Sequence, residues 1–261
     1  MMRLCFALAL MPVSVLAAEP DHTAHTAAVV TAPHDHAAMT TYGAPQPASP
    51  SIQLVAHDHG GMVNHFLMAE RFERQQRDGN DVDVWDTQGW LGSDYHKLWL
   101  KTEGSWQPNS GKAGDVEVQL LYSRAVAPFW DLQAGIRHDE GGNASRDYVV
   151  FGMQGLAPYW FEVDAAAFVN EESGLQLRLD ADYDLRLTQK LFLQPRLQLN
   201  HAFDDDKAGG IDQGMRDSNV ALRLRYEVIR EFAPYVGVER DIGGHRQPDE
   251  LRVVAGIRVW Y

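Results

Sequence analysis

Outside its first 18 residues the chain lacks cysteine, because the only cysteine of the 261 residues is Cys5. This absence excludes disulfides, zinc sites built on thiolates and thiol catalysis. It also suits export to an oxidising compartment, where a free thiol would be oxidised. The sequence further lacks any apolar run that approaches the roughly 18 residues of a membrane helix.

Positive charge is scarce. The chain has 23 lysines and arginines against 36 aspartates and glutamates, which gives a formal net charge of −13. Nucleic acid needs a basic surface to neutralise its phosphates, so we expect no nucleic-acid partner. An acidic protein instead attracts cations.

Residues 1–18 have the features of a secretory signal peptide. Arg3 gives a basic start, Leu4 to Leu16 form an apolar core, and Ala17 and Ala18 are small residues suited to cleavage. The apolar core is too short to span a bilayer. We therefore predict export and removal of this segment.

Residues 19–63 differ in composition from everything after them. They are rich in Ala, Thr, Pro and His, and they contain no Trp, Phe, Lys or Arg. No helical or strand period is visible, and such a segment buries too little apolar surface to offset its ordering entropy. We predict a disordered tail.

Residues 64–261 predict an all-β fold, a closed antiparallel transmembrane β-barrel. From Leu251 to Tyr261 every second residue is apolar, as in the last strand of an outer-membrane barrel. Residues 175–188 alternate over a length that exceeds the usual strand of soluble proteins. The alternative for both segments is a soluble β-sandwich.

The same alternation and its turn signals predict twelve strands. Their expected ranges are 66–75, 81–90, 97–106, 114–126, 129–138, 147–156, 159–169, 174–188, 191–203, 217–229, 233–240 and 250–261. The alternation is weaker in the first two ranges. If these residues instead formed a plug or a periplasmic hairpin, the barrel would have ten strands. Short and long connections alternate, as expected for periplasmic turns and external loops. The tryptophans are expected in interfacial girdles, with core packing as the alternative for any one of them.

The tail carries most of the residues suited to metal binding. Two units repeat the pattern His-Asp-His, each followed by a methionine three residues later. Imidazole binds Cu(II), Zn(II) and Ni(II), and thioether sulfur selects Cu(I), so the segment is suited to copper in either oxidation state. Polar filler in a low-complexity linker is the alternative. The candidate metal ligands are His22, His25, His34, His36, Met39, His57, His59, Met62 and His65.

Three motifs occur in order at the start of the predicted barrel. They span 65–73 (HFLMAERFE), 81–90 (DVDVWDTQGW) and 97–104 (KLWLKTEG). With the barrel-like remainder, they resemble the copper resistance protein B family over residues 60–261. The resemblance implies an outer-membrane protein of a bacterial copper resistance system, which works with periplasmic copper-handling proteins. Family members often have a methionine-rich N-terminal region, whereas this tail is dominated by histidine.

Alternating strands place charged residues in the predicted lumen. The inward carboxylates Glu117, Asp131, Glu162, Asp164, Asp180, Asp182 and Asp184 are expected to face inward arginines Arg137, Arg178, Arg186, Arg196, Arg223, Arg225 and Arg258. One interpretation is an ion-paired interior that braces the barrel, which we favour. The other is a cation path with at least one unpaired carboxylate. Met68, His96, His138, Met153, His201, Met215 and His245 are further candidate copper ligands.

Three classes of function compete on these features. The first is a copper-binding outer-membrane protein that sequesters copper or passes it across the membrane, with its tail in the periplasm. The second is a general small porin or adhesin whose His-rich tail is incidental. The third is an outer-membrane hydrolase, which we do not expect because the sequence has no G-x-S-x-G motif.

Overall fold

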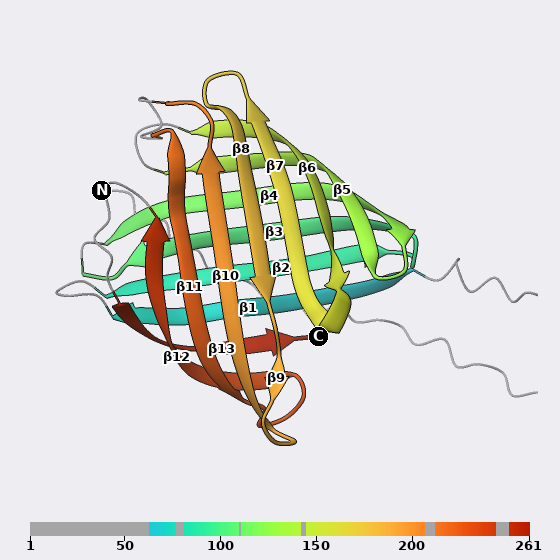
Figure 1. Ribbon diagram of the computed structural model, residues 1–261, viewed down its shortest axis with the longest axis vertical. Coiled ribbons are helices and arrows are strands. Elements are labelled where there is room, and N and C mark those ends of the chain that lie inside the picture. Colours follow the sequence, from blue (N-terminus) through green and yellow to red (C-terminus); the bar gives the residue numbers. More distant parts are fainter. Residues whose placement is uncertain (1–62, 77–80, 110, 142–144, 207–211, 244–250) are drawn as a thin grey trace, which may run out of the picture. The chain divides into compact units, whose positions relative to one another are not determined.

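The computed structural model describes residues 63–76, 81–109, 111–141, 145–206, 212–243 and 251–261, and these residues form one closed antiparallel barrel (Figure 1). Its strands are β1 (Asn64–Gln76), β2 (Val82–Gly92), β3 (His96–Gln107), β4 (Lys112–Ala127), β5 (Trp130–Glu140), β6 (Arg146–Ala157), β7 (Phe161–Asn170), β8 (Gly174–Asp182), β9 (Leu185–Arg186), β10 (Leu191–Ala202), β11 (Gly214–Tyr226), β12 (Phe232–Gly243) and β13 (Leu251–Trp260). A 3-10 turn, Pro158–Trp160, precedes β7.

The barrel closes where its first and last strands meet. β1 pairs with β2 on one side and with β13 on the other, and β10 pairs with β11 to complete the ring. Both β8 and the two-residue β9 pair with β10 in antiparallel register, so they are one wall strand interrupted at Tyr183 and Asp184. The wall therefore has twelve strands, and closure leaves it without an exposed sheet edge.

The prediction of a twelve-stranded barrel is confirmed. β1 and β2 belong to the wall, so they are neither a plug nor a separate hairpin. The predicted strand 174–188 is correct in position but broken, because residues 183 and 184 leave the ladder. The tail at 19–62 lies outside the described residues, as does the signal segment. Among the described residues, no helix is long and apolar enough to cross a membrane.

Side chains alternate between two different environments along each strand. On β4, Val118, Leu120 and Tyr122 are exposed on the outside, whereas Glu117, Gln119 and Ser123 are buried inside. The other strands repeat this arrangement, which gives an apolar outer surface and a polar lumen. The alternation follows from the two-residue period of a strand.

Close packing of an aromatic ring over a glycine helps the wall to close. Tyr235 on β12 is the register partner of Gly256 on β13, and a Cβ atom at Gly256 would lie 2.7 Å from the Tyr235 hydroxyl. It would also lie 2.6 Å from the carbonyl oxygen of Phe72 on β1. The missing side chain thus lets Tyr235 lie across β13 towards β1.

The two ends of the barrel differ in their connections. At the end that we call the turn end, strands are joined by 93–95, 128–129, 158–160, 187–190 and 227–231. At the opposite loop end they are joined by 77–81, 108–111, 141–145, 171–173, 203–213 and 244–250. The longest connection lies at the loop end, as predicted, but 171–173 is as short as a turn, because β7 continues to Asn170 and β8 begins at Gly174.

The tryptophans only partly follow the girdle prediction. Trp106 and Trp160 are exposed near strand ends. Trp99, by contrast, is buried in the lumen wall, where its ring lies 6.4 Å from that of Trp90. These two rings come from register partners on β2 and β3 and belong to the inner surface. For them core packing, the alternative to a girdle position, is found, because adjacent strands present both residues to the same inner face.

Candidate functional site

A β-bulge in β1 delivers two consecutive charged residues to the lumen. Ala69 pairs with Thr87 of β2, and the next pair joins Arg71 to Asp86. Glu70 is the extra residue, and both Glu70 and Arg71 line the same small lumen cavity. Bulges re-aim side chains in this way beside functional sites. Strict alternation would have turned one of the two outwards.

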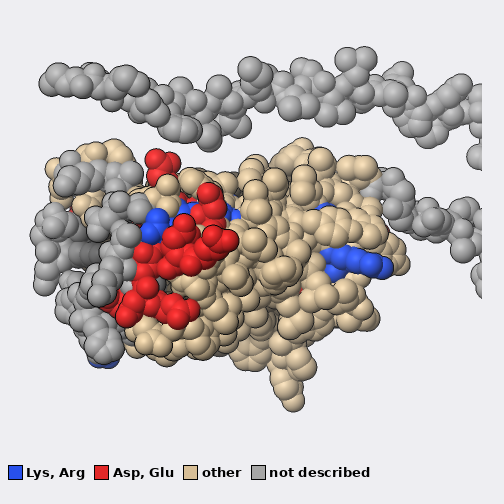
Figure 2. Space-filling view, turned by 90° about the horizontal axis from the view of Figure 1, so that it is seen from above, with Lys and Arg blue, Asp and Glu red and all other residues tan. Residues whose placement is uncertain are grey.

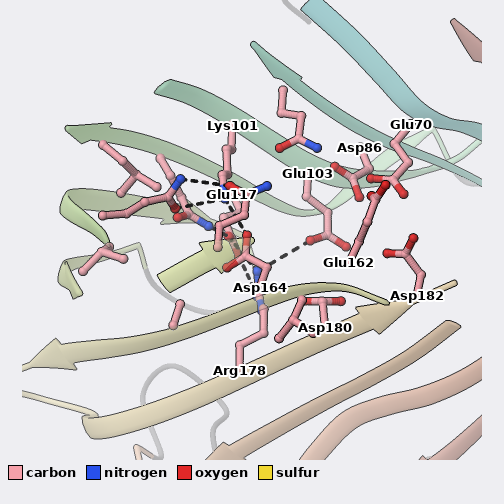
Figure 3. A pocket seen from close by; sticks show the side chains of 18 of the residues that line it. Glu70, Asp86, Lys101, Glu103, Glu117, Glu162, Asp164, Arg178, Asp180 and Asp182 are labelled. Carbon is pink, nitrogen blue, oxygen red and sulfur yellow. Dashed lines mark hydrogen bonds and ion pairs between the residues drawn. The ribbon is translucent and has the colours of Figure 1, made fainter. Parts of the chain in front are cut away.

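The lumen contains a cavity towards the turn end, which we call the turn-end chamber (Figure 3). Its volume is about 320 Å³. Three cations line it, Lys101, Arg178 and Arg196. The carboxylates that line it are Glu70, Asp86, Glu103, Glu117, Glu162, Asp164, Asp180 and Asp182. Carboxylates therefore outnumber cations in this chamber.

Several carboxylates of the turn-end chamber are held by cations from other strands. Lys101 Nζ on β3 lies 2.6 Å from Asp164 Oδ2 on β7. Arg196 Nη2 on β10 lies 3.1 Å from Asp180 Oδ1 on β8. The first pair joins parts of the wall far apart in sequence, and the second joins two paired strands, so both brace the barrel.

Two carboxylates of this chamber differ from the rest. Asp182 accepts a hydrogen bond from Gln194 Nε2 at 3.2 Å and has no ion pair among the described residues. Glu162, its register partner on β7, has neither an ion pair nor a hydrogen bond from a described side chain. Glu70 is held only loosely, with Arg196 Nη1 at 3.7 Å. The turn-end chamber thus has carboxylates that no cation of the described wall holds in a close ion pair.

A second cavity, the loop-end chamber, has a volume of about 330 Å³. The charges in its lining are nearly balanced. Its cations are Arg71, Arg137, Arg146, Arg178, Arg216 and Arg252, and its carboxylates are Glu103, Asp115, Glu117, Asp139, Glu140, Glu239 and Asp241.

Buried ion pairs link the strands on either side of the closure, in what we call the closing network: Glu73, Arg223, Glu239, Arg252 and Asp241. Arg223 Nη2 on β11 lies 3.1 Å from Glu73 Oε2 on β1 and 2.8 Å from Glu239 Oε2 on β12. Arg252 Nη2 on β13 lies 2.8 Å from Glu239 Oε1 and also pairs with Asp241. The Glu73 side chain is 0% exposed and accepts a hydrogen bond from the Tyr235 hydroxyl.

Acidic side chains are also exposed at the loop end, and two of them, Asp115 and Glu140, line the loop-end chamber as well. Figure 2 shows them as a red patch next to the grey segments. Exposed carboxylates at this end are Asp115, Glu140, Asp147, Glu171, Glu172, Asp204, Asp205 and Asp212. A cation approaching from this side meets an attractive surface.

Most of the predicted metal ligands fall outside the described residues: His22, His25, His34, His36, Met39, His57, His59 and Met62. His65 is described and is exposed on β1, with its ring 5.9 Å from that of Tyr261. Among the described residues, no three His, Cys, Asp or Glu side chains are arranged to hold a metal ion.

Of the further candidate ligands, Met153, His201 and Met215 line one open cavity, and the other described candidates do not line it. His96, His138, Met153, His201 and Met215 are exposed, and His245 is not among the described residues. Met68 is buried, and its Sδ accepts a hydrogen bond from Arg258 Nη2 at 3.3 Å. His201 and Met215 are register partners at the loop end. Both residues lie far along the barrel from Asp182, which has no ion pair among the described residues. This carboxylate is therefore not lined up with His201 and Met215, as a cation path leading to them would require.

The pairing of the three aspartates near the end of β8 is mixed. Asp180 pairs with Arg196, and Asp184 pairs with Arg225 Nη2 at 2.5 Å. Asp182, between them, has no arginine partner among the described residues. The bracing interpretation therefore holds for two of the three positions, and the unpaired carboxylate required by the cation path is present at the third.

The sequence did not identify several lumen residues. Lys101 and Glu103 were visible in the alternation of 97–104, where Lys97, Trp99, Lys101 and Glu103 share one face. Glu73, Glu239, Asp241 and Arg252 also follow strand alternation and were missed. Glu70 gave no such signal, because its inward position depends on the bulge.

Comparison with known proteins identifies the family. The family "Copper resistance protein B precursor (CopB)" matches residues 63–261. Copper resistance protein B of Escherichia coli is 37% identical over 213 residues, which cover 78% of this chain and 71% of the relative. The copper resistance protein B homolog of Pseudomonas syringae pv. tomato (strain ATCC BAA-871 / DC3000) is 38% identical over 213 residues, covering 78% and 72%.

Among solved structures, a KdgM porin in complex with disordered oligogalacturonate is similar in fold, with a TM-score of 0.48 and 13% identity. The match covers 74% of this chain and 98% of the porin chain. On the strength of the family match and the two relatives, this chain belongs to the copper resistance protein B family.

Proposed function

We propose that this protein lies in the bacterial outer membrane, binds copper and passes it across that membrane. The outer surface of the barrel supports this location. Large apolar side chains such as Leu120, Ile136 and Phe151 are exposed on its outside, while the charged residues of the same strands point into the lumen. This is the distribution expected of a barrel in lipid.

We assign the turn end to the periplasm, because bacterial barrels have short periplasmic turns and longer external loops. β1 begins at the turn end, so the tail that precedes it is then periplasmic. The acidic loop end faces the exterior and attracts cations there.

The tail is the proposed high-affinity copper segment. Its paired His-Asp-His units supply imidazoles for Cu(II), and Met39 and Met62 supply thioethers for Cu(I). Periplasmic copper-handling proteins of the same resistance system are the proposed partners, since copper held by the tail must be passed on.

The observation that carries passage rather than storage is the unpaired negative charge of the turn-end chamber. Glu162 and Asp182 lie beside each other with no ion pair among the described residues. Carboxylates are hard ligands and hold copper more weakly than imidazole or thiolate groups do. Weak ligands suit a site that a passing cation enters and leaves.

Binding and passage require no catalytic group, and we propose no enzymatic step. The best-placed histidine near a serine was His138, in the same stretch as Ser145. His138 Nδ1 instead contacts Asp147 Oδ1 at 2.6 Å on the exposed surface. Among the described residues no hydrogen bond joins His138 to the Ser145 hydroxyl.

Two measurements on one set of proteins test this function. Liposomes containing the full-length protein should admit copper, and the fragment 63–261 should admit it while binding fewer copper ions. Replacing His34, His36, His57 and His59 by Ala in the full-length protein should reproduce the lower copper binding and leave the barrel folded. Equal binding by all three proteins would refute the tail assignment, and liposomes that remain impermeable to copper would refute passage.

A general porin with an incidental tail predicts a different result. It would pass small neutral solutes as readily as copper. Measuring the uptake of a neutral sugar by the same liposomes therefore separates the two functions.

A further inference from the structure

Only four residues among those described line both lumen chambers: Glu103, Glu117, Phe168 and Arg178. We call them the partition. They come from β3, β4, β7 and β8, so they reach into the lumen from different parts of the wall. Any solute that moves from one chamber to the other passes these four side chains.

Arg178 makes the contacts that close the partition. Its Nη1 and Nη2 atoms each lie 2.9 Å from an oxygen of Glu117, a bidentate pair that joins β8 to β4. Its Nη1 also lies 3.7 Å from Glu103 Oε2. Its Nε donates to Asn200 Oδ1 at 2.9 Å, and the guanidinium lies 5.3 Å from the ring centre of Phe168.

The ion pairs continue on both sides of Arg178. Arg71 Nη2 lies 2.7 Å from Glu103 Oε1, and Arg137 Nη2 lies 2.8 Å from Glu117 Oε2. Arginines and glutamates therefore alternate from β1 through β3, β8 and β4 to β5. The positive charge of Arg178 stands between the two carboxylates that a cation would otherwise meet at this level.

We propose that Arg178 is the gating and selectivity residue of the lumen. While it is paired with Glu117, it separates the two chambers and repels cations at the partition. A divalent cation that enters the partition competes with the guanidinium for Glu117 and Glu103, and its higher charge favours it over a monovalent cation. For copper this inference rests on the proposed passage, but the gate itself can be tested without copper.

Bracing is the competing role for the same contacts. A residue that only braces the barrel would affect folding, and its charge would not affect which ions cross. The sign of ion selectivity separates the two roles, because a structural defect has no reason to change sign with the charge removed.

The experiment records current through the full-length protein in planar lipid bilayers under a potassium chloride gradient. Arg178→Gln should raise the conductance severalfold and shift the reversal potential towards cation selectivity. Glu117→Gln should shift the reversal potential in the opposite direction, because it leaves Arg178 with only the more distant Glu103. Arg178→Lys keeps the charge but not the bidentate contact, so it should keep the wild-type selectivity.

Arg223→Gln is the matched control. It removes an arginine that is buried and ion-paired in the closing network but lines neither chamber. It should lower stability without shifting the reversal potential.

The proposal is overturned if Arg178→Gln and Arg223→Gln change the current alike, or if Arg178→Gln and Glu117→Gln shift the reversal potential in the same direction. Should Arg178→Gln fail to fold, Glu117→Gln still decides the question by the sign of its shift: a shift towards cation selectivity, or none, would overturn the proposal, as would a shift in Arg178→Lys. Opposite shifts in proteins that admit no copper would refute copper passage while leaving the gate intact.

Discussion

The two chambers of the lumen have nearly the same volume and differ in how their charges are used. Arginines and carboxylates are almost equal in number in the loop-end chamber, and they join a buried network that links β1, β11, β12 and β13. In the turn-end chamber carboxylates exceed cations, and Asp182 and Glu162 lack ion pairs among the described residues. The difference indicates that the charges of the loop-end chamber nearly balance, whereas the turn-end chamber combines bracing ion pairs with two carboxylates that have no ion pair among the described residues.

Energetics explain why the two arrangements have different consequences. A buried ion pair gains little over apolar packing, but removing one partner leaves an uncompensated charge away from water. Removing a carboxylate that is unpaired and reaches water leaves no oppositely charged partner buried without compensation. Substitutions in the two chambers should therefore separate stability from copper movement.

The largest effect on stability is expected at Glu73. Glu73→Ala leaves Arg223 buried with one carboxylate fewer and removes the acceptor of the Tyr235 hydroxyl. Breaking such a pair from one side costs about 3–5 kcal/mol. Urea unfolding in lipid vesicles measures this loss, with Asp83→Ala in the exposed pair with Arg74 as the control. Exposed pairs contribute about 0–1 kcal/mol, so equal losses would refute the role of the closing network.

A smaller effect is expected at Gly256, which gives the network its space. In Gly256→Ala the new methyl group would crowd the Phe72 carbonyl oxygen, the Glu73 Cβ and the Tyr235 hydroxyl. Overpacking of this kind costs about 1–3 kcal/mol. The same urea-unfolding assay measures this loss of stability. Gly111→Ala would not serve as its control, because the backbone of Gly111 is left-handed and any side chain there is strained. In the double variant with Tyr235→Phe, the loss should be less than additive. Full additivity would show that the glycine and the tyrosine act separately.

The wall of the barrel was largely predictable from the sequence, because alternate residues of each strand face the outside, where they are apolar, and the lumen, where they are polar. Residues 116–123 and 251–261 show this most clearly, and both form strands close to the expected limits. Even the weaker pair at 66–75 and 81–90 was placed correctly. The break at Tyr183 and Asp184 was not predicted, since the apolar alternation continues through it.

The pairing inside the lumen was not predictable in the same way. Alternation says that Arg178 and Glu117 point inwards, but it does not say that residues 61 positions apart meet across the lumen. That contact depends on strand register and on the curvature of the wall. Glu70 was a second failure of the pattern, because a bulge changes the side to which a residue points without altering composition. The metal-binding tail gave a clear chemical signal, and it stays a prediction.

The central claim is that paired carboxylates brace the barrel and unpaired ones carry copper. Asp182, at the end of β8, and Asp184, in the break before β9, test it most directly. Asp182→Asn and Asp184→Asn make the same chemical change two residues apart, where only Asp184 has an arginine partner among the described residues. Copper flux into liposomes and thermal stability should be measured side by side on both variants. We predict that Asp182→Asn lowers flux and leaves stability unchanged, whereas Asp184→Asn lowers stability. Unchanged flux in Asp182→Asn, or equal loss of stability in both variants, would contradict the account.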